Sequence, residues 1–365
     1  MKIGIVTYHR TLNYGAVMQS LATRFVLEEM GHEAYYVDYW PDYHREMYAL
    51  FPKTKFSKLN WLQKAKFLLL LGRNYKSQKR RIENFDKFFQ THIYPYCRSM
   101  DESFDVVIYG SDQIWRKQKA LGTYNPVYFG DNTIKTRHNV SYAASMGIFP
   151  DNDADKTKVK ELVSHLERIS VREEGLRHLL QSLGYNDVSL SLDPTLLLSS
   201  EKWDEFLPTE PYKGKRYVLV YLLGTITFDL KEVRKFADDR RLEMKVLRGY
   251  ATTKESESNI TSAGPYEFIR LIKNADYVFT ASFHGLAFSI IYGRQFFASY
   301  KKNSERASSL LNLLGLSDRL LPVNCEIPRD PSDIDYEEVR NKLHVKRDES
   351  LNYLLEISRI GGAED

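Results

Sequence analysis

The sequence predicts an α/β fold with two doubly wound, Rossmann-like domains that face a cleft and a basic helical insertion in the first domain. Three observations predict it. Short apolar segments alternate with segments of helical periodicity in both halves of the chain. Polar residues directly follow several of the apolar segments. In doubly wound sheets, ligands bind at this place, beyond the carboxyl ends of the strands. The polar stretch 208–215 separates the halves, and 365 residues suit two domains of about 150 residues each.

The first half opens with a strand–helix–strand unit. An apolar strand is predicted at 3–7 and a helix at 15–30, where Val17, Leu21 and Phe25 recur at helical spacing. Gly31 ends that helix, as glycine often does. A strand at 34–38 completes the unit. After the insertion at about 41–100, the predicted elements are strands at 104–109, 140–144, 169–171 and 189–192, and a helix at 174–183.

The second half repeats the alternation after the linker. Domain boundaries are predicted at 1–207 for the first Rossmann-like domain, 216–322 for the second, and 323–365 for a helical tail that packs back on the first domain. The predicted strands are 217–223, 244–247, 276–280 and 295–300, and the predicted helices are 230–239, 265–274 and 286–292.

Composition excludes several classes of protein. With 43% hydrophobic and 27% charged residues, the chain resembles an ordinary globular protein and not a disordered one. Its two cysteines, Cys97 and Cys325, lie far apart without metal-ligand spacing, so we expect no disulfide framework, metal or cofactor. The N-terminus lacks a signal-peptide pattern, and the chain has no apolar run long enough to span a membrane. A cytoplasmic protein is expected.

Charge is concentrated in one segment. Residues 53–98 hold twelve Lys or Arg against Glu83 and Asp86, whereas the whole chain has a net charge of only +4. The segment also contains the apolar run Phe67–Leu71. Such a stretch either contacts an anionic membrane surface or substrate, or is an amphipathic helix with a solvated basic face. No nucleic-acid-binding motif accompanies it, so we expect no nucleic acid partner.

Two strand ends carry residues suited to anions. His284 and Gly285 lie where the predicted helix begins after strand 276–280, and a helix N-terminus favours an anion. His284 could bind phosphate or donate a proton, although a lone histidine can also be structural. Arg172 follows strand 169–171, and a guanidinium binds carboxylate or phosphate through two bonds, unless the next two glutamates simply pair with it.

Two further segments are weaker candidates. In Gly110–Gln113, Asp112 could act as a base toward a hydroxyl or could cap a helix. Asn13 and Tyr14 precede the first helix in a loop without either nucleotide-binding glycine fingerprint, and they could bond a sugar.

Together these segments resemble the polysaccharide pyruvyl transferase family, in family order over about residues 1–320. The matching segments are 3–15 (IGIVTYHRTLNYG), 104–115 (FDVVIYGSDQIW), 141–147 (SYAASMG), 169–174 (ISVREE), 192–195 (LDPT), 265–285 (PYEFIRLIKNADYVFTASFHG) and 303–315 (NSERASSLLNLLG).

The resemblance implies a GT-B-like fold and a transferase of polysaccharide biosynthesis. Its implied donor is phosphoenolpyruvate, its acceptor a sugar of a surface polysaccharide or its precursor, and its product a pyruvate ketal. We then expect His284 and Asp112 to be catalytic, as general acid and phosphate ligand and as base on the acceptor hydroxyl. The expected donor-binding residues are Arg172, Ser282, Gly285 and Arg306, and the expected acceptor-binding residues are Asn13, Tyr14 and Gln113.

One departure from the family pattern concerns the donor site. Some ketal-forming members resemble Arg-Leu-His where this chain has Ser282-Phe283-His284. Arg248, Lys301 or Arg306 could supply the missing charge.

Two other functions fit the same sequence. One is a GT-B glycosyltransferase with a nucleotide-sugar donor, because the helix N-terminus at Gly285 suits a pyrophosphate equally well. The other is a non-catalytic protein that binds anions or a membrane surface, at the inner face of the membrane, through residues 53–98.

Overall fold

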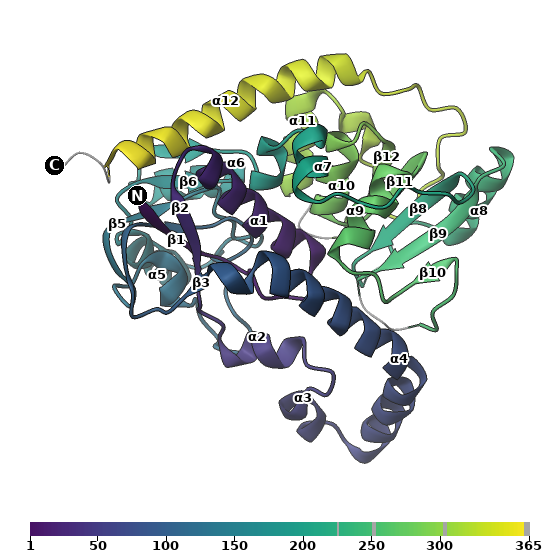
Figure 1. Cartoon of the computed structure of the whole chain (residues 1–365), viewed down its shortest axis with the longest axis horizontal. Coiled ribbons are helices and arrows are strands. Elements are labelled where there is room, and N and C mark those ends of the chain that lie inside the picture. Colours follow the sequence, from purple (N-terminus) through teal and green to yellow (C-terminus); the bar gives the residue numbers. More distant parts are fainter. Residues whose placement is uncertain (225, 250–252, 302–304, 361–365) are drawn as a thin grey trace.

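The computed structural model describes residues 1–224, 226–249, 253–301 and 305–360, and it contains two parallel five-stranded sheets (Figure 1). The first sheet has the order β3-β2-β1-β4-β5. Ile3 of β1 lies opposite Ala34 of β2 on one side and Val106 of β4 on the other. The strands are β1 Lys2–Val6, β2 Glu33–Val37, β3 Cys97–Arg98, β4 Ser103–Tyr109 and β5 Lys135–Ser141.

Two short strands extend this sheet beyond β5. β6 (Ile169–Val171) and β7 (Val188–Leu190) pair with each other in parallel. The Ser141 amide donates to the Arg168 carbonyl, and the Ala144 amide donates to the Ser170 carbonyl. β6 therefore follows β5 in the same direction, and its carboxyl end lies beside that of β5.

The second sheet repeats the first in its topology. Its order is β10-β9-β8-β11-β12, with every pair parallel. The predicted α/β fold with two doubly wound sheets is thus confirmed. The strands are β8 Tyr217–Leu222, β9 Glu243–Arg248, β10 Asn259–Ile260, β11 Tyr277–Thr280 and β12 Gln295–Ala298.

Helices cover both sheets and fill the space between them. The first half carries α1 Tyr14–Glu29, α5 Asp153–Val163, α6 Glu174–Ser182 and α7 Ser200–Phe206, and the second half carries α8 Leu230–Asp239, α9 Pro265–Lys273, α10 Phe283–Ile291 and α11 Glu305–Leu314. Short 3₁₀ turns lie at Tyr94–Tyr96, Pro126–Phe129, Pro194–Leu197 and Ser317–Arg319.

The basic insertion folds as three helices, α2 (Asp42–Met47), α3 (Lys53–Ser57) and α4 (Trp61–His92). Asn60 begins α4 with a reciprocal cap, in which the Asn60 side chain accepts from the Gln63 backbone amide and the Gln63 side chain accepts from the Asn60 backbone amide. Among the described helices, none has the length and apolarity needed to cross a bilayer.

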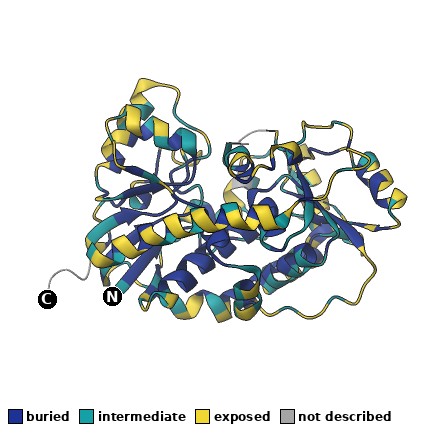
Figure 2. Cartoon of the chain, turned by 90° about the horizontal axis from the view of Figure 1, so that it is seen from above, coloured by how far each residue is buried: buried dark blue, intermediate teal, exposed yellow. Residues whose placement is uncertain are grey.

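The final helix, α12 (Tyr336–Ile360), contacts both halves of the molecule. Tyr353 donates to the Ser141 carbonyl of β5, and Ser350 accepts from the Leu192 amide. At the other end of the helix, Tyr336 donates to the carbonyls of Ser289 and Arg294 in the second half. Figure 2 views the molecule from the α12 side and shows buried residues in the strands of both sheets.

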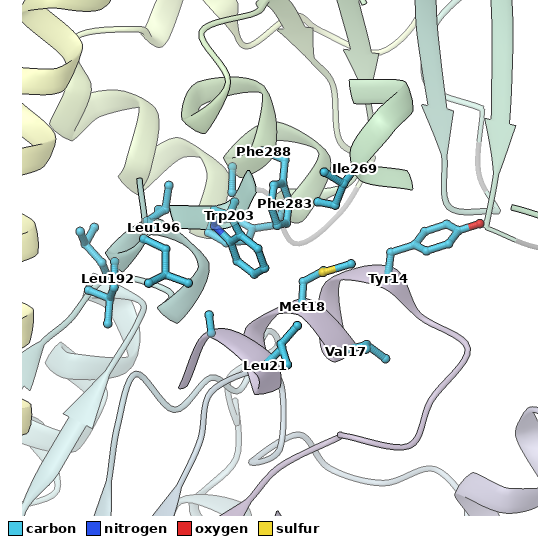
Figure 3. Packing of buried hydrophobic residues seen from close by; sticks show 14 of the residues in the cluster. Tyr14, Val17, Met18, Leu21, Leu192, Leu196, Trp203, Ile269, Phe283 and Phe288 are labelled. Atoms are coloured by element: carbon cyan, nitrogen blue, oxygen red, sulfur yellow. The ribbon is translucent and has the colours of Figure 1, made fainter. Parts of the chain in front are cut away.

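One hydrophobic core joins the two halves. It includes Tyr14, Met18 and Leu21 of α1 together with Phe283 and Phe288 of α10. Figure 3 shows Met18 and Leu21 on one side and Phe283 and Phe288 on the other, with Trp203 of α7 between them. The ends of α1 and α10 are therefore fixed relative to each other by apolar packing across the two halves.

Three predicted boundaries differ from the structure. β5 begins at Lys135 and ends at Ser141, because its polar N-terminal residues pair with the full length of β4, from Ser103 opposite Lys135 onward. α10 begins at Phe283 because the Ser282 hydroxyl accepts from the Gly285 amide and caps the helix. β7 is confined to Val188–Leu190, because Asp193 already starts a 3₁₀ turn.

Candidate functional site

Asp193 is the centre of a buried polar cluster at the carboxyl ends of the first sheet. Its Oδ1 accepts from the Thr195 amide at 3.0 Å and from the Thr195 hydroxyl at 2.7 Å, which starts the 3₁₀ turn at Pro194. Its Oδ2 accepts from Arg172 Nη1 and lies 3.4 Å from His284 Nε2. Burial alone raises the pKa of Asp193, but His284 and Arg172 outweigh burial and hold this pKa well below its usual range. Asp193 is therefore an anion at neutral pH.

Arg172 retains unused hydrogen-bonding capacity. Its side chain is 3% exposed, and its Nε and Nη2 make no hydrogen bond to any described residue. Nη2 lies 4.0 Å from Asp112 Oδ1, beyond hydrogen-bonding distance. Because buried N–H groups are nearly always paired, these two N–H groups are available to bind a ligand. A planar guanidinium suits a carboxylate or phosphate ligand.

A second buried arginine lies beside the first. The guanidinium carbons of Arg172 and Arg306 lie 5.0 and 5.4 Å from the centre of the Phe283 ring. Arg306 Nε is buried without a hydrogen bond in the described part of the chain and lies 3.9 Å from Glu173 Oε1. Burial and the neighbouring Arg172 lower the pKa of Arg306. Two guanidinium groups from different halves of the molecule thus share one aromatic ring.

Glu173 is the carboxylate nearest to Arg306. It is 1% exposed, accepts from the Ser145 hydroxyl through Oε1, and leaves Oε2 without a hydrogen bond to the described residues. Burial raises its pKa, although Arg172 and Arg306 act in the opposite direction. A buried carboxyl with a raised pKa beside arginines that keep unbonded N–H groups is typical of functional sites.

His284 is positioned by three elements. The capped first turn of α10 carries it, Asp193 faces its Nε2, and the backbone of Gly15 in α1 lies against the other side of its ring. A methyl group added to Gly15 would lie 2.0 Å from Nδ1. The carboxylate of Asp193 can therefore hold the imidazole in one orientation, as carboxylates do beside functional histidines.

Asp112 lies in an irregular segment after β4, and no helix begins there, so the competing role of helix cap is wrong. It has a φ of 58°, and its Oδ1 accepts from the Gln113 amide at 2.8 Å. Gly110 is required by close packing, because a methyl group there would lie 2.0 Å from the Tyr142 carbonyl. The glycine thus accommodates the backbone that follows β5.

Ser282 and Gly285 are joined by the cap that begins α10, so the hydroxyl and that amide are already used. The predicted acceptor residues have structural contacts as well. Asn13 accepts from the Gly15 amide and caps α1, and buried Tyr14 donates to the Ala263 carbonyl and accepts from Arg81. The Gln113 side chain lies beside Gly147.

A cavity of about 630 Å³ adjoins the cluster. Its lining includes Arg172, Asp193, Phe283 and Arg306, together with residues of α6, α11 and α12 and of the segment 189–192. His284 and Asp112 do not line this cavity. The space is large enough for a small anionic ligand.

Of the three cations considered as replacements for the missing family arginine, Arg306 lies at the cluster. Arg248 donates to Asn259 at 2.6 Å, and Lys301 is exposed. Asn303, which opens the last family segment, lies outside the described residues.

One group of possible metal ligands lies elsewhere in the described structure. His9, Asp38 and Cys97 each place one ligand atom within 4.8 Å of the others. Asp38 already pairs with Arg10, and a guanidinium beside the carboxylate opposes a cation. The sequence did not indicate this group, because the three residues follow three different strand boundaries.

Comparison with known families identifies the chain. The model of the polysaccharide pyruvyl transferase family matches residues 13–300. The chain belongs to the polysaccharide pyruvyl transferase family. It is therefore a transferase, and the resemblance inferred from the ordered sequence segments is confirmed. A search of curated proteins finds no match.

Solved structures show distant likenesses to this family member. UDP-GlcNAc 2-epimerase from Methanocaldococcus jannaschii has 12% identity and a TM-score of 0.46, with 99% of this chain and 100% of that chain covered. Heptosyltransferase WaaC from E. coli has 12% identity and a TM-score of 0.37, with 95% of this chain and 100% of that chain covered. The spinosyn rhamnosyltransferase SpnG has 11% identity and a TM-score of 0.36, with 96% of this chain and 95% of that chain covered. These values assign no substrate.

Asp193 and Glu173 are the two members of the cluster that sequence reasoning did not select. Both stand in segments that resemble the family, LDPT and ISVREE, and both lie within three residues of a strand end. Their position just after a strand was the signal that could have identified them. However, Asp193 precedes a proline in a turn and Glu173 precedes a helix, so both looked purely structural.

Proposed function

We propose that this transferase moves the pyruvyl group of phosphoenolpyruvate onto a sugar of a surface polysaccharide or its precursor and forms a ketal. The observation that supports the proposal is the pair Arg172 and Arg306, which are buried, lie on one aromatic ring and keep unbonded N–H groups at a cavity. Phosphoenolpyruvate carries a carboxylate and a phosphate, and both anions need such partners.

The transfer requires two proton movements. Carbon 3 of the donor gains a proton, carbon 2 becomes electrophilic, and one sugar hydroxyl adds to it and gives up its proton. The second hydroxyl then closes the ketal and loses its proton as the bond from carbon 2 to the phosphate oxygen breaks. One proton remains on carbon 3 and the other leaves with phosphate, so the overall reaction needs no oxidant or reductant.

We assign roles by chemistry and position. Arg172 binds the donor carboxylate or phosphate, with Arg306 beside it. His284, oriented by Asp193, contacts the phosphate and is the candidate general acid. Asp112, 4.0 Å from Arg172, is the candidate base on the acceptor hydroxyl. His284 shares Asp193 with Arg172, and neither His284 nor Asp112 lines the cavity, so the proposal requires a donor that extends from the cavity past Arg172.

Glu173 is a second candidate acid within this proposal. Burial raises its pKa, and its Oε2 has no hydrogen bond to the described residues. A carboxyl that remains protonated nearer to neutral pH can donate a proton to carbon 3.

The test is release of phosphate from phosphoenolpyruvate with a panel of nucleotide-linked and lipid-linked sugars. His284→Ala and Arg172→Ala should each lower turnover by about 100-fold or more, with the fold retained. Arg216→Ala is the matched control, because it removes an exposed arginine that pairs with Asp276 at a distance from the cluster. Wild-type turnover by His284→Ala would remove that residue from the mechanism.

The alternative donor, a nucleotide sugar, is tested in the same assay. Turnover of nucleotide sugars without phosphoenolpyruvate would replace the proposal with glycosyl transfer. We place the reaction in the cytoplasm, at the inner face of the membrane, and the basic insertion supports this position.

A further inference from the structure

The first half of α4 presents an apolar surface that nothing in the described structure covers. From Trp61 to Arg73 no side chain is buried, and Figure 1 shows α3 and the first turns of α4 projecting from the body of the molecule. Trp61 and Leu69 are each 75% exposed, Leu62 is 60% exposed and Leu68 is 49% exposed. Large apolar side chains exposed together on one surface usually mark an interaction site.

These four side chains lie on one side of the helix. At 3.6 residues per turn, Trp61, Leu68 and Leu69 fall on the same face, with the small residues Ala65 and Gly72 between them. We name Trp61, Leu62, Leu68 and Leu69 the outer stripe. An ordinary amphipathic helix at the surface of a protein packs its apolar side against the core and exposes its polar side. Here the apolar outer stripe is exposed instead.

The opposite side of the same turns is already packed. Phe67 lies 5.5 Å from the ring of Phe56 and 5.7 Å from that of Phe51. Leu71 and Asn74 line a second cavity, of about 370 Å³, on that inner side. The helix therefore has two apolar faces, of which the inner one holds α3 in place and the outer stripe remains for a partner.

Cationic side chains flank the outer stripe on both sides. By helical geometry Lys64 lies along one border, Lys66 and Arg73 lie along the other, and Lys76 continues the stripe. No acidic residue occurs between Trp61 and Ile82. A central row of Trp and Leu with cationic borders is the arrangement by which amphipathic helices bind the interface of anionic membranes.

The remainder of α4 fixes this surface to the transferase body. Arg81 is 5% exposed and donates to the Leu12 carbonyl of the first half and to the Arg248 carbonyl of the second half. Asn84 donates to the Ser262 carbonyl. The projecting turns are therefore a rigid extension of a helix clamped between the two halves, and not a free tail.

We propose that the outer stripe docks the protein onto an anionic lipid surface, with Trp61, Leu68 and Leu69 in the interface and Lys64, Lys66 and Arg73 at the headgroups. A second copy of this chain is disfavoured, because a symmetric pairing would bring two segments of high positive charge together. A nucleic acid is disfavoured because the centre of the surface is apolar, with three leucines beside Trp61, and the chain carries no nucleic-acid-binding motif. This goes beyond the transfer reaction and does not depend on its donor.

The test is co-sedimentation of the full chain with phosphatidylcholine vesicles, with and without phosphatidylglycerol. We expect tight binding only to the anionic vesicles, and weakening when salt rises from about 0.1 M to about 0.5 M. Leu69→Glu should weaken binding by about tenfold or more. Val345→Glu is the matched control, because Val345 is 57% exposed on α12, far from the stripe, and its variant should bind normally.

Tryptophan emission gives a second, local readout. Trp61 is the most exposed tryptophan, whereas Trp115 and Trp203 are fully buried, so vesicles should shift the emission to the blue in the wild type and not in Trp61→Phe. Binding that Leu69→Glu leaves unchanged would overturn the proposal. The proposal would also be overturned if the protein formed a concentration-dependent dimer, or bound duplex DNA tightly, and if Leu69→Glu abolished that dimer or that binding. Unchanged melting temperatures of the variants establish that they are folded, and phosphate release in solution remains an independent assay of the donor.

Discussion

The imidazole of His284 lies directly against the backbone of Gly15. A methyl group on Gly15 would lie 2.0 Å from Nδ1 and 2.3 Å from Cγ of the ring, distances at which atoms overlap. The two residues begin different helices, α1 and α10, from different halves of the chain. The position of His284 therefore depends on a glycine that lies some 270 residues earlier in the sequence.

Gly15→Ala should displace His284 and lower kcat/KM by about tenfold or more, because small displacements of catalytic groups are costly. The position has no positive φ, so the effect comes from the contact and not from backbone strain. Gly72→Ala is the control, since a methyl group there meets nothing within 4 Å and alanine favours the helix. Wild-type activity in Gly15→Ala would show that the ring can move without consequence.

Asp193→Asn should destabilise the protein by about 3 kcal/mol at neutral pH, because it leaves the buried Arg172 without its anion. The folded-state pKa of Asp193 lies well below its unfolded value of about 3.9. Its contribution is therefore present above that unfolded pKa and is lost as the pH falls through the folded pKa. Urea unfolding of both proteins between about pH 7 and pH 3 measures this. The difference should be constant above about pH 5 and should shrink below about pH 4, where the unfolded carboxylate becomes protonated. A difference that stays constant down to about pH 3, or that grows on acidification, would contradict the account.

Glu173→Gln should have the opposite pH dependence. Burial raises the folded-state pKa of Glu173 above its unfolded value of about 4.3. Its favourable contribution is present below that value and is lost as the pH rises through the folded pKa. The stability of the wild type relative to the glutamine variant should therefore decrease from about pH 4 upward. A relative stability that increases over this range in urea titrations would show that Glu173 is favoured as an anion.

Arg81→Ala should lower the free energy of unfolding by about 3 kcal/mol, because it leaves several buried carbonyls and the Tyr14 hydroxyl without their donor. The neighbouring Arg80 is exposed, so Arg80→Ala should change this free energy by less than about 0.5 kcal/mol. Denaturant unfolding compares the two variants. Equal effects would mean that Arg81 does not clamp α4 between the halves.

The sequence predicted both sheets because their strands are short apolar runs separated by helical periodicity. It did not predict β3 and β10, which are two residues long and carry little apolar signal. The contacts of Arg81 were also out of reach, because the residue looks like any other cation of a basic helix. Only the fold shows that it is buried against carbonyls from Leu12 and Arg248.

The candidate site was predictable in its type of residue but not in its partners. Arg172 and His284 follow strands, which indicated anion chemistry. Their joint contact with Asp193 depends on how the two halves pack, and no local pattern encodes that contact. Likewise, the loop before the first helix suggested a sugar contact for Tyr14, whereas tertiary packing gives its hydroxyl to Ala263 and Arg81.

The most direct test of the central proposal is the melting temperature with and without phosphoenolpyruvate, in the wild type, Arg172→Ala and the Arg216→Ala control. Ligand at 100 times its Kd stabilises a protein by about 2.7 kcal/mol, so we expect an increase of several degrees in the wild type and the control. Arg172→Ala should lose that increase. No increase with phosphoenolpyruvate, together with one from a nucleoside diphosphate, would contradict the proposed donor.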